Sequence, residues 1–176
     1  EVYKRQEWYR SFASLEEIAD DIEALLKSFV PDARLLRVTM RELFRDCLQI
    51  DLTPETTAED LRESAQRLQV RTAQDDEFGD IFHRLFLEKI EPFLNEISRG
   101  EPLLIRSYPP SMSALARIGD DGFADRFEVY WKGLELCNAF HELNDPSENR
   151  MRFERDNREK QQSGRTPVPL DNELLR

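Results

Sequence analysis

The sequence contains little cysteine, histidine or glycine, and it has no long apolar run. Its 176 residues include two cysteines, Cys47 and Cys137, two histidines and no C-x-x-C motif, so neither a disulfide framework nor a zinc site is expected. No stretch approaches the roughly 20 apolar residues that a membrane-spanning helix needs, and no signal peptide is visible. These absences favour a protein of the reducing cytoplasm with no membrane partner.

Positive charge is also in short supply. The chain has 36 acidic residues against 25 basic ones, which gives a formal net charge of −11. This balance disfavours non-specific binding to nucleic acids, because phosphate contacts need clustered Lys and Arg. It suits a pocket that selects a cation, such as a substrate carrying an amine. The length is sufficient for one domain with a real core.

The most informative stretch runs from residue 126 to residue 145. Two runs rich in aromatic and aliphatic residues flank Lys132-Gly133, a pattern typical of two strands joined by a tight turn. Three glutamates interrupt this apolar hairpin: Glu128, Glu135 and Glu142. A carboxylate is costly to bury unless a cation, a metal or several donors accompany it, so their concentration indicates a site. The alternative is that they only face solvent on an edge hairpin.

Helical patterns surround the hairpin. Capping boxes and apolar residues at helical spacing predict helices that begin near residues 14, 39, 57, 74 and 146. Pro92 is expected to kink or divide the helix over about 74–97. A buried strand is predicted over 103–108 and a short one near 35–38. Because a tight hairpin requires antiparallel pairing, we expect an α+β fold in which helices flank an antiparallel sheet.

The two ends of the chain differ from the rest. Residues 2–6, Val-Tyr-Lys-Arg-Gln, resemble the translated end of a sequencing transposon, so we expect residues 1–6 to be a non-native leader. Residues 174–176, Leu-Leu-Arg, stop in what reads as the beginning of an apolar helical pattern. We therefore expect residues 7–176 to be an internal part of a longer protein.

A resemblance to a known family rests on the hairpin and on three further stretches. Residues 126–145 resemble the signature hairpin of class II lysyl-tRNA synthetases and of their shortened paralogue, the ligase that attaches β-lysine to elongation factor P. Phe140-His141-Glu142-Leu143 resembles the paralogue, because the synthetases usually carry serine where His141 stands. The other stretches are Glu7-Trp8-Tyr9-Arg10, Tyr108 to Ala116, and Arg152 to Asn157. The resemblance implies a partial class II catalytic core, from the end of motif 2 to just before motif 3.

The resemblance also implies roles for the hairpin residues. Glu128 and Glu135 would be the carboxylates of the ATP–Mg²⁺ site, and Mg²⁺ prefers one or two carboxylates together with waters and phosphates. Glu142 would hold the distant ammonium of lysine or β-lysine, Asn138 would bind its carboxylate end, and Phe140 would pack in the pocket. Strand alternation puts Asn138, Phe140 and Glu142 on one face, which Glu135 joins only through a β-bulge between residues 135 and 138.

Two N-terminal residues belong to the same implied site. Glu7 and Tyr9 alternate on what would be the last strand of motif 2, where the resemblance places them at the amine end of the substrate. His141 has the opposite parity to Glu142, so it is interpreted as a packing residue and not as a general base.

The resemblance implies an ATP-dependent, AMP-forming ligase that activates lysine or β-lysine as an adenylate and transfers it to a lysine of elongation factor P. One alternative is a lysine–tRNA ligase, and a second is a module that binds an amino acid without activating it. The acidic balance weakly favours the protein acceptor over tRNA. The family's catalytic arginines of motifs 2 and 3 lie outside this sequence. We therefore expect this chain alone to be inactive and the longer protein to be an active homodimer.

Overall fold

The computed structural model describes residues 6–162, 164–173 and 175. The expected leader therefore lies almost wholly outside the described residues. The chain separates into two compact units, Glu1–His141 and Glu142–Arg176, which are described one at a time.

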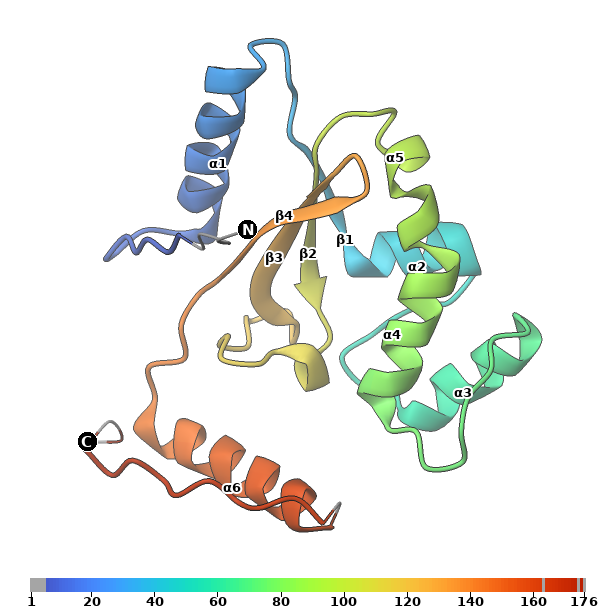
Figure 1. Ribbon diagram of the computed structural model, residues 1–176, viewed down its shortest axis with the longest axis vertical. Coiled ribbons are helices and arrows are strands. Elements are labelled where there is room, and N and C mark those ends of the chain that lie inside the picture. Colours follow the sequence, from blue (N-terminus) through green and yellow to red (C-terminus); the bar gives the residue numbers. More distant parts are fainter. Residues whose placement is uncertain (1–5, 163, 174, 176) are drawn as a thin grey trace, which may run out of the picture. The chain divides into compact units, whose positions relative to one another are not determined.

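A four-stranded sheet forms the centre of the first unit, with the strands in the order β1 (Leu36–Thr39), β2 (Leu103–Tyr108), β3 (Ala124–Trp131) and β4 (Leu134–Phe140). Both β2–β3 and β3–β4 are antiparallel, whereas β1 runs parallel to β2 (Figure 1). The α+β class is confirmed, and the expected antiparallel sheet gains one parallel edge. The parallel pair follows from the long helical connection between β1 and β2, since parallel neighbours need such a crossover.

Helix α1 (Leu15–Phe29) covers one face of this sheet (Figure 1). Ser14 forms the expected capping box, in which its hydroxyl accepts from the Glu17 backbone N–H at 3.3 Å and the Glu17 carboxylate accepts from the Ser14 N–H at 2.8 Å. The buried residues of this layer come from α1, the sheet and the segment before β1: Ala19, Ile22, Leu35, Leu104, Phe127 and Val129.

The helices between β1 and β2 cover the opposite face. They are α2 (Met40–Leu48), α3 (Ala58–Arg67), α4 (Phe78–Lys89), the 3₁₀ turn η1 (Glu91–Phe93) and α5 (Leu94–Ile97). Phe82 of α4 stacks on Phe44 of α2 with ring centroids 5.0 Å apart. The ring centroids of Phe86 in α4 and Tyr130 in β3 are 6.0 Å apart, so this helical layer packs against the hairpin. The expected single helix over 74–97 is divided before Pro92, because proline cannot donate the next helical hydrogen bond.

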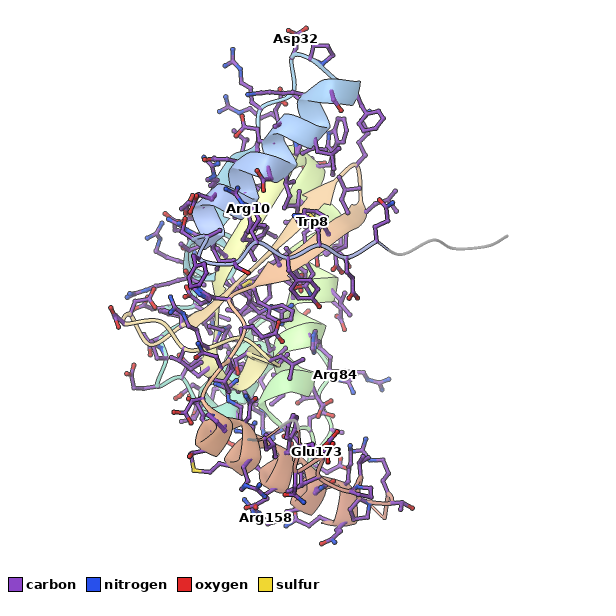
Figure 2. All side chains as sticks on the ribbon, turned by 90° about the vertical axis from the view of Figure 1, so that its left-hand side faces the viewer. Trp8, Arg10, Asp32, Arg84, Arg158 and Glu173 are labelled. Carbon is purple, nitrogen blue, oxygen red and sulfur yellow. The ribbon has the colours of Figure 1, made fainter. Side chains whose placement is uncertain are left out.

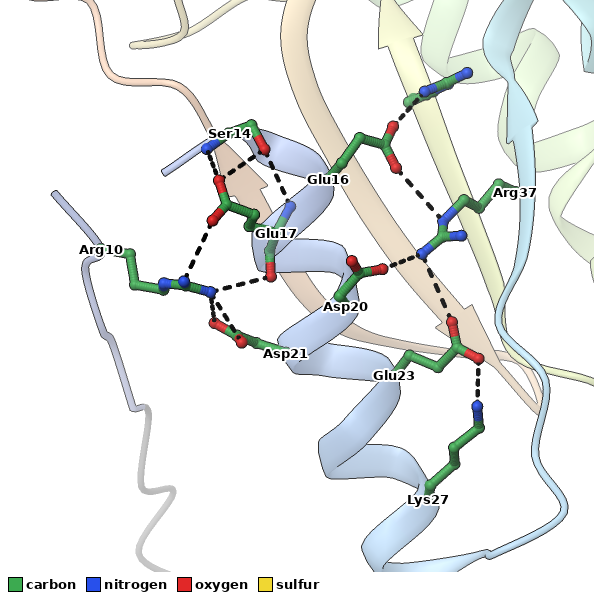
Figure 3. Close-up of polar contacts among 10 residues, drawn as sticks. Arg10, Ser14, Glu16, Glu17, Asp20, Asp21, Glu23, Lys27 and Arg37 are labelled. Carbon is green, nitrogen blue, oxygen red and sulfur yellow. Dashed lines mark hydrogen bonds and ion pairs between the residues drawn. The ribbon is translucent and has the colours of Figure 1, made fainter. Parts of the chain in front are cut away.

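Ion pairs join the acidic outer side of α1 to neighbouring segments (Figure 3). Arg37 of β1 lies 2.8 Å from Asp20 and 3.6 Å from Glu23, and Arg106 of β2 bonds to Glu16 at 2.6 Å. Each of these pairs is partly exposed and so contributes at most about 1 kcal/mol. They orient α1 over the sheet, while the apolar layer beneath supplies the larger share of the stability.

The second unit is built on α6 (Pro146–Gln162). Asp145 caps it as expected, since its carboxylate accepts from the Glu148 backbone N–H at 2.8 Å. The Asn157 side chain exchanges two hydrogen bonds with the Val168 backbone, at 2.8 and 2.9 Å, which fixes the returning segment along the helix. Throughout the described residues, no helix has the length and apolar character to cross a bilayer.

Candidate functional site

The hairpin turn at Lys132-Gly133 has the geometry that the sequence predicts. Both residues are left-handed, with φ of 52° and 76°, and Trp131 pairs directly with Leu134. Two central residues with positive φ make a type I′ turn, whose twist matches that of the flanking strands. The turn therefore fixes the register of the two strands that carry the candidate site.

One extra residue in β4 changes which side chains share a face. The pairs are Glu128 with Asn138 and Val129 with Cys137, but Tyr130 pairs with Glu135 and so skips Leu136. This break is the β-bulge expected between residues 135 and 138. Residues opposite each other in a ladder point to the same side, so Glu135 returns to the face of Asn138.

The structure thus brings together four of the seven residues proposed for the site. Glu128, Glu135, Asn138 and Phe140 share one face of the β3–β4 hairpin, because Phe140 pairs with Arg126 and alternates with Asn138. Glu135 and Asn138 are exposed and Phe140 is 36% exposed, so this part of the face is open to a ligand.

Glu128 is less exposed than Glu135, Asn138 and Phe140, and its carboxylate accepts from three donors. One carboxylate oxygen, Oε2, accepts from the Tyr108 hydroxyl at 2.6 Å and from the Tyr130 hydroxyl at 2.8 Å. The other, Oε1, accepts from the Arg126 guanidinium. None of these three partners was predicted from the sequence. Arg126 and Tyr130 could have been found, since they alternate with Glu128, whereas Tyr108 comes from another strand and left no local pattern.

Cys137 and His141 lie on the other side of the hairpin. Cys137 packs against the α1 layer, and burial, aided by the charge of Glu135, raises the pKa of its thiol to about 11. His141 Nδ1 is 3.6 Å from Asp125 Oδ2, and its backbone N–H bonds to the Asp125 carbonyl at 2.9 Å. His141 also helps to line a hollow of about 460 Å³ beside α1, and none of the seven proposed site residues lines that hollow. The packing interpretation of His141 agrees with this position.

Glu7 and Tyr9 do not lie on a strand, so that expectation is wrong. Residues 6–10 are irregular and exposed, with Tyr9 80% accessible, and Figure 2 shows Trp8 and Arg10 on this segment. A strand needs hydrogen bonds to a neighbouring strand. The described sheet ends at β4, and residues 6–10 form no ladder with it. The segment is held instead by Arg10, which bonds to Asp21 of α1 at 3.0 Å.

Glu142 lies beyond the end of the strand. Because β4 stops at Phe140, the face predicted for residues 138, 140 and 142 extends along the strand only to Phe140. Glu142 is exposed and begins the second compact unit.

The donor set of the hairpin fits Mg²⁺ held jointly with phosphates. Among the residues that the structure describes, no three His, Cys, Asp or Glu side chains are grouped closely enough to hold a metal by themselves. Mg²⁺ in nucleotide sites needs only one or two carboxylates, the remaining ligands being water and phosphate oxygens. Glu128, which is mostly buried, and the exposed Glu135 share one face of the hairpin and would supply that number of carboxylates.

Comparison with known proteins identifies the family. Residues 3–166 match the family described as tRNA synthetases class II (D, K and N). The chain belongs to this family. The class II resemblance drawn from the hairpin is therefore confirmed, and the sheet described above is part of a class II synthetase domain.

Among curated relatives, several carry the name elongation factor P–(R)-β-lysine ligase. The chain is 36% identical over 174 residues to the one from Salmonella arizonae and 35% identical over 173 residues to those from Klebsiella pneumoniae and Yersinia enterocolitica. Each alignment covers 96% of this chain and 52% of the relative. The chain thus spans about half the length of these class II relatives.

Proposed function

We propose that the protein carrying this chain is an ATP-dependent ligase that activates lysine or β-lysine and transfers it to a lysine side chain of elongation factor P. In the first step a carboxylate oxygen of the amino acid attacks the α-phosphorus of ATP, and pyrophosphate leaves. In the second step the acceptor amine attacks the carbonyl carbon of the adenylate, and AMP leaves. Proteins catalyse such transfers chiefly through positioning and charge neutralisation.

One observation carries this proposal. The bulge at Leu136 brings Glu128, Glu135, Asn138 and Phe140 to the same face of the hairpin, and this supports a ligand shared among them. Without it, Glu135 would face the α1 layer, away from Asn138. The name that the curated relatives share supports the same reaction. Members of this family bind ATP and an amino acid.

The residues of this face have complementary tasks. The Asn138 amide can donate to the substrate carboxylate, and the half-exposed Phe140 ring offers apolar surface to the methylene chain of lysine. Glu142 is proposed to hold the distant ammonium, with Glu7 and Tyr9 assigned to the same end by family resemblance. Glu128 and Glu135 would hold Mg²⁺, which when bound offsets the negative charge of the phosphates.

A lysine–tRNA ligase is the second candidate, favoured by the description of the matching family. The two functions share the activation step and differ in the acceptor. The third candidate is a module that binds lysine without activating it, and it would form neither modified elongation factor P nor charged tRNA.

The molecule that receives the lysyl group distinguishes these three candidate functions. The protein at its full length would be incubated with ATP, Mg²⁺, each lysine isomer, elongation factor P and lysine tRNA. The products would be followed by intact mass and by tRNA acylation side by side. We expect a lysyl-sized mass gain on elongation factor P, uncharged tRNA, and loss of the mass gain in Glu142→Gln but not in Glu88→Gln, an exposed glutamate of α4. Charged tRNA with unmodified factor would replace the proposal with the second candidate.

A further inference from the structure

The carboxylate of Glu128 on the candidate face accepts three hydrogen bonds. Its three donors come from two strands: Tyr108 from the end of β2, and Arg126 and Tyr130 from β3. Both tyrosines are buried, and the side chains of Arg126 and Glu128 are only 12% and 13% exposed. Such a carboxylate cannot change rotamer without breaking several hydrogen bonds at once.

Arg126 is itself fixed from two further directions. Its Nη1 donates to the Met112 carbonyl at 2.9 Å, in the 3₁₀ turn η2 (Pro110–Met112), and its guanidinium carbon lies 4.4 Å from the centre of the Tyr108 ring. A guanidinium over an aromatic face at this distance gains cation–π attraction. Its Nε is buried and has no hydrogen-bond partner among the described residues. A buried donor without a partner is uncommon and calls for a specific explanation, such as an ordered water, a bound ion or a functional role.

The two tyrosines are dependable donors. Tyr108 and Tyr130 are buried, and both hydroxyls donate to the same carboxylate oxygen of Glu128, Oε2. An ionised carboxylate only accepts, so these two bonds have a fixed direction.

We propose that Tyr108, Arg126 and Tyr130 are positioning residues that fix the Glu128 carboxylate and set how much of its charge is available to the nucleotide-bound cation. The inference rests on the proposed function of the same face. A carboxylate has about four lone-pair sites, and the three donors leave Glu128 roughly one. Exposed Glu135, opposite Tyr130, supplies the second carboxylate.

The three residues should therefore influence Mg²⁺ dependence more than lysine binding. Groups that orient a metal ligand typically change metal affinity or activity by about 10–100-fold when they are removed. Tyr108→Phe deletes one donor and keeps the ring under Arg126. We expect it to shift the half-saturating Mg²⁺ concentration by about 10-fold or more, with the KM for lysine unchanged.

The test combines the Mg²⁺ dependence of ATP binding to the full-length protein, measured by calorimetry without lysine, with ATP–pyrophosphate exchange titrated with Mg²⁺ at saturating lysine. Tyr108→Phe and Tyr130→Phe are the variants, and the second keeps the test valid should the first not fold. Arg126→Lys is compared with the matched control Arg117→Lys, since Arg117 is an exposed arginine that bonds to Asp125 at 2.8 Å. In a Glu128→Gln background, Tyr108→Phe is expected to cause no further shift, because the bond it removes serves Glu128.

The results separate this inference from the function beneath it. An active wild type whose Tyr→Phe variants keep the wild-type Mg²⁺ dependence would overturn the inference and leave the ligase proposal standing. A uniform fall in kcat that tracks thermal stability would also overturn it, since that is what a purely structural role would give. A wild type without exchange activity would refute the proposed function, and the Mg²⁺ dependence of ATP binding would still decide the inference.

Discussion

Replacing Gly133 with alanine should lower the free energy of unfolding by about 1–2 kcal/mol, the cost of one left-handed residue with a Cβ. Gly133 has φ of 76° in the hairpin turn. A Cβ built at this position meets no atom within 4 Å, so the penalty is backbone strain alone and no steric clash adds to it. The position therefore measures the left-handed turn directly.

Urea unfolding followed by the fluorescence of Trp131, which adjoins the turn, is the assay. With a denaturant slope of about 2 kcal/mol per M, the middle of the usual range, the midpoint should fall by about 0.5–1 M. Gly79→Ala is the matched control. Its Cβ would lie 3.6 Å from Met112 Sδ, an ordinary contact, and alanine is favoured over glycine within a helix by about 0.5–1 kcal/mol. The control should raise the midpoint, and a Gly133→Ala midpoint at or above wild type would refute the type I′ turn.

Four further predictions concern stability and reactivity. Thr39→Ala should cost about 1 kcal/mol in urea unfolding and Thr39→Ser much less, because the hydroxyl caps the Glu42 backbone N–H at 3.1 Å. The Thr39 backbone N–H and then its hydroxyl lower the pKa of Glu42. The contribution of the Glu42 carboxylate to the free energy of unfolding is therefore present above its unfolded-state pKa and is lost as the pH falls through its folded-state pKa. Glu42→Gln should flatten the dependence of this free energy on pH between about pH 7 and about pH 3. Phe82→Ala should cost about 3–5 kcal/mol, because its ring is 1% exposed and stacked on Phe44, whereas His83→Ala on the exposed side of α4 should cost little. With a pKa of about 11, the Cys137 thiol should react with a disulfide reagent at neutral pH about 100-fold more slowly than a free thiol. The rate would be measured in a Cys47→Ala variant, in which Cys137 is the one remaining cysteine of the sequence. A rate equal to that of a free thiol would contradict the burial of Cys137.

The local elements were predictable because their causes are local. Ser14 and Thr39 each carry a capping partner three residues later, and both boxes form. Lys132-Gly133 marks the turn through its spacing between two apolar runs. The bulge is a different case, because it was inferred from a conflict between Glu135 and strand parity, and the ladder resolves that conflict at Leu136.

The features that were missed depend on partners distant in the sequence. Tyr108 reaches Glu128 from 20 residues away, and nothing near Tyr108 indicates a carboxylate. The parallel pairing of β1 with β2 places Leu36 opposite Leu103, although helices α2 to α5 separate these two residues in the sequence. For Glu7 and Tyr9 the family resemblance implied a strand, yet residues 6–10 pair with no neighbouring strand of the described sheet, and a strand requires that pairing.

The central claim is that one face of the β3–β4 hairpin binds ATP–Mg²⁺ and lysine. The most direct measurement is ATP–pyrophosphate exchange by the full-length protein carrying Glu135→Gln or Asn138→Ala, with Glu88→Gln and Cys137→Ala as controls on the surface of α4 and on the opposite face of the hairpin. The account predicts that both face variants lose about 100-fold or more in rate while both controls stay near wild type. Face variants that exchange as fast as the controls would contradict it.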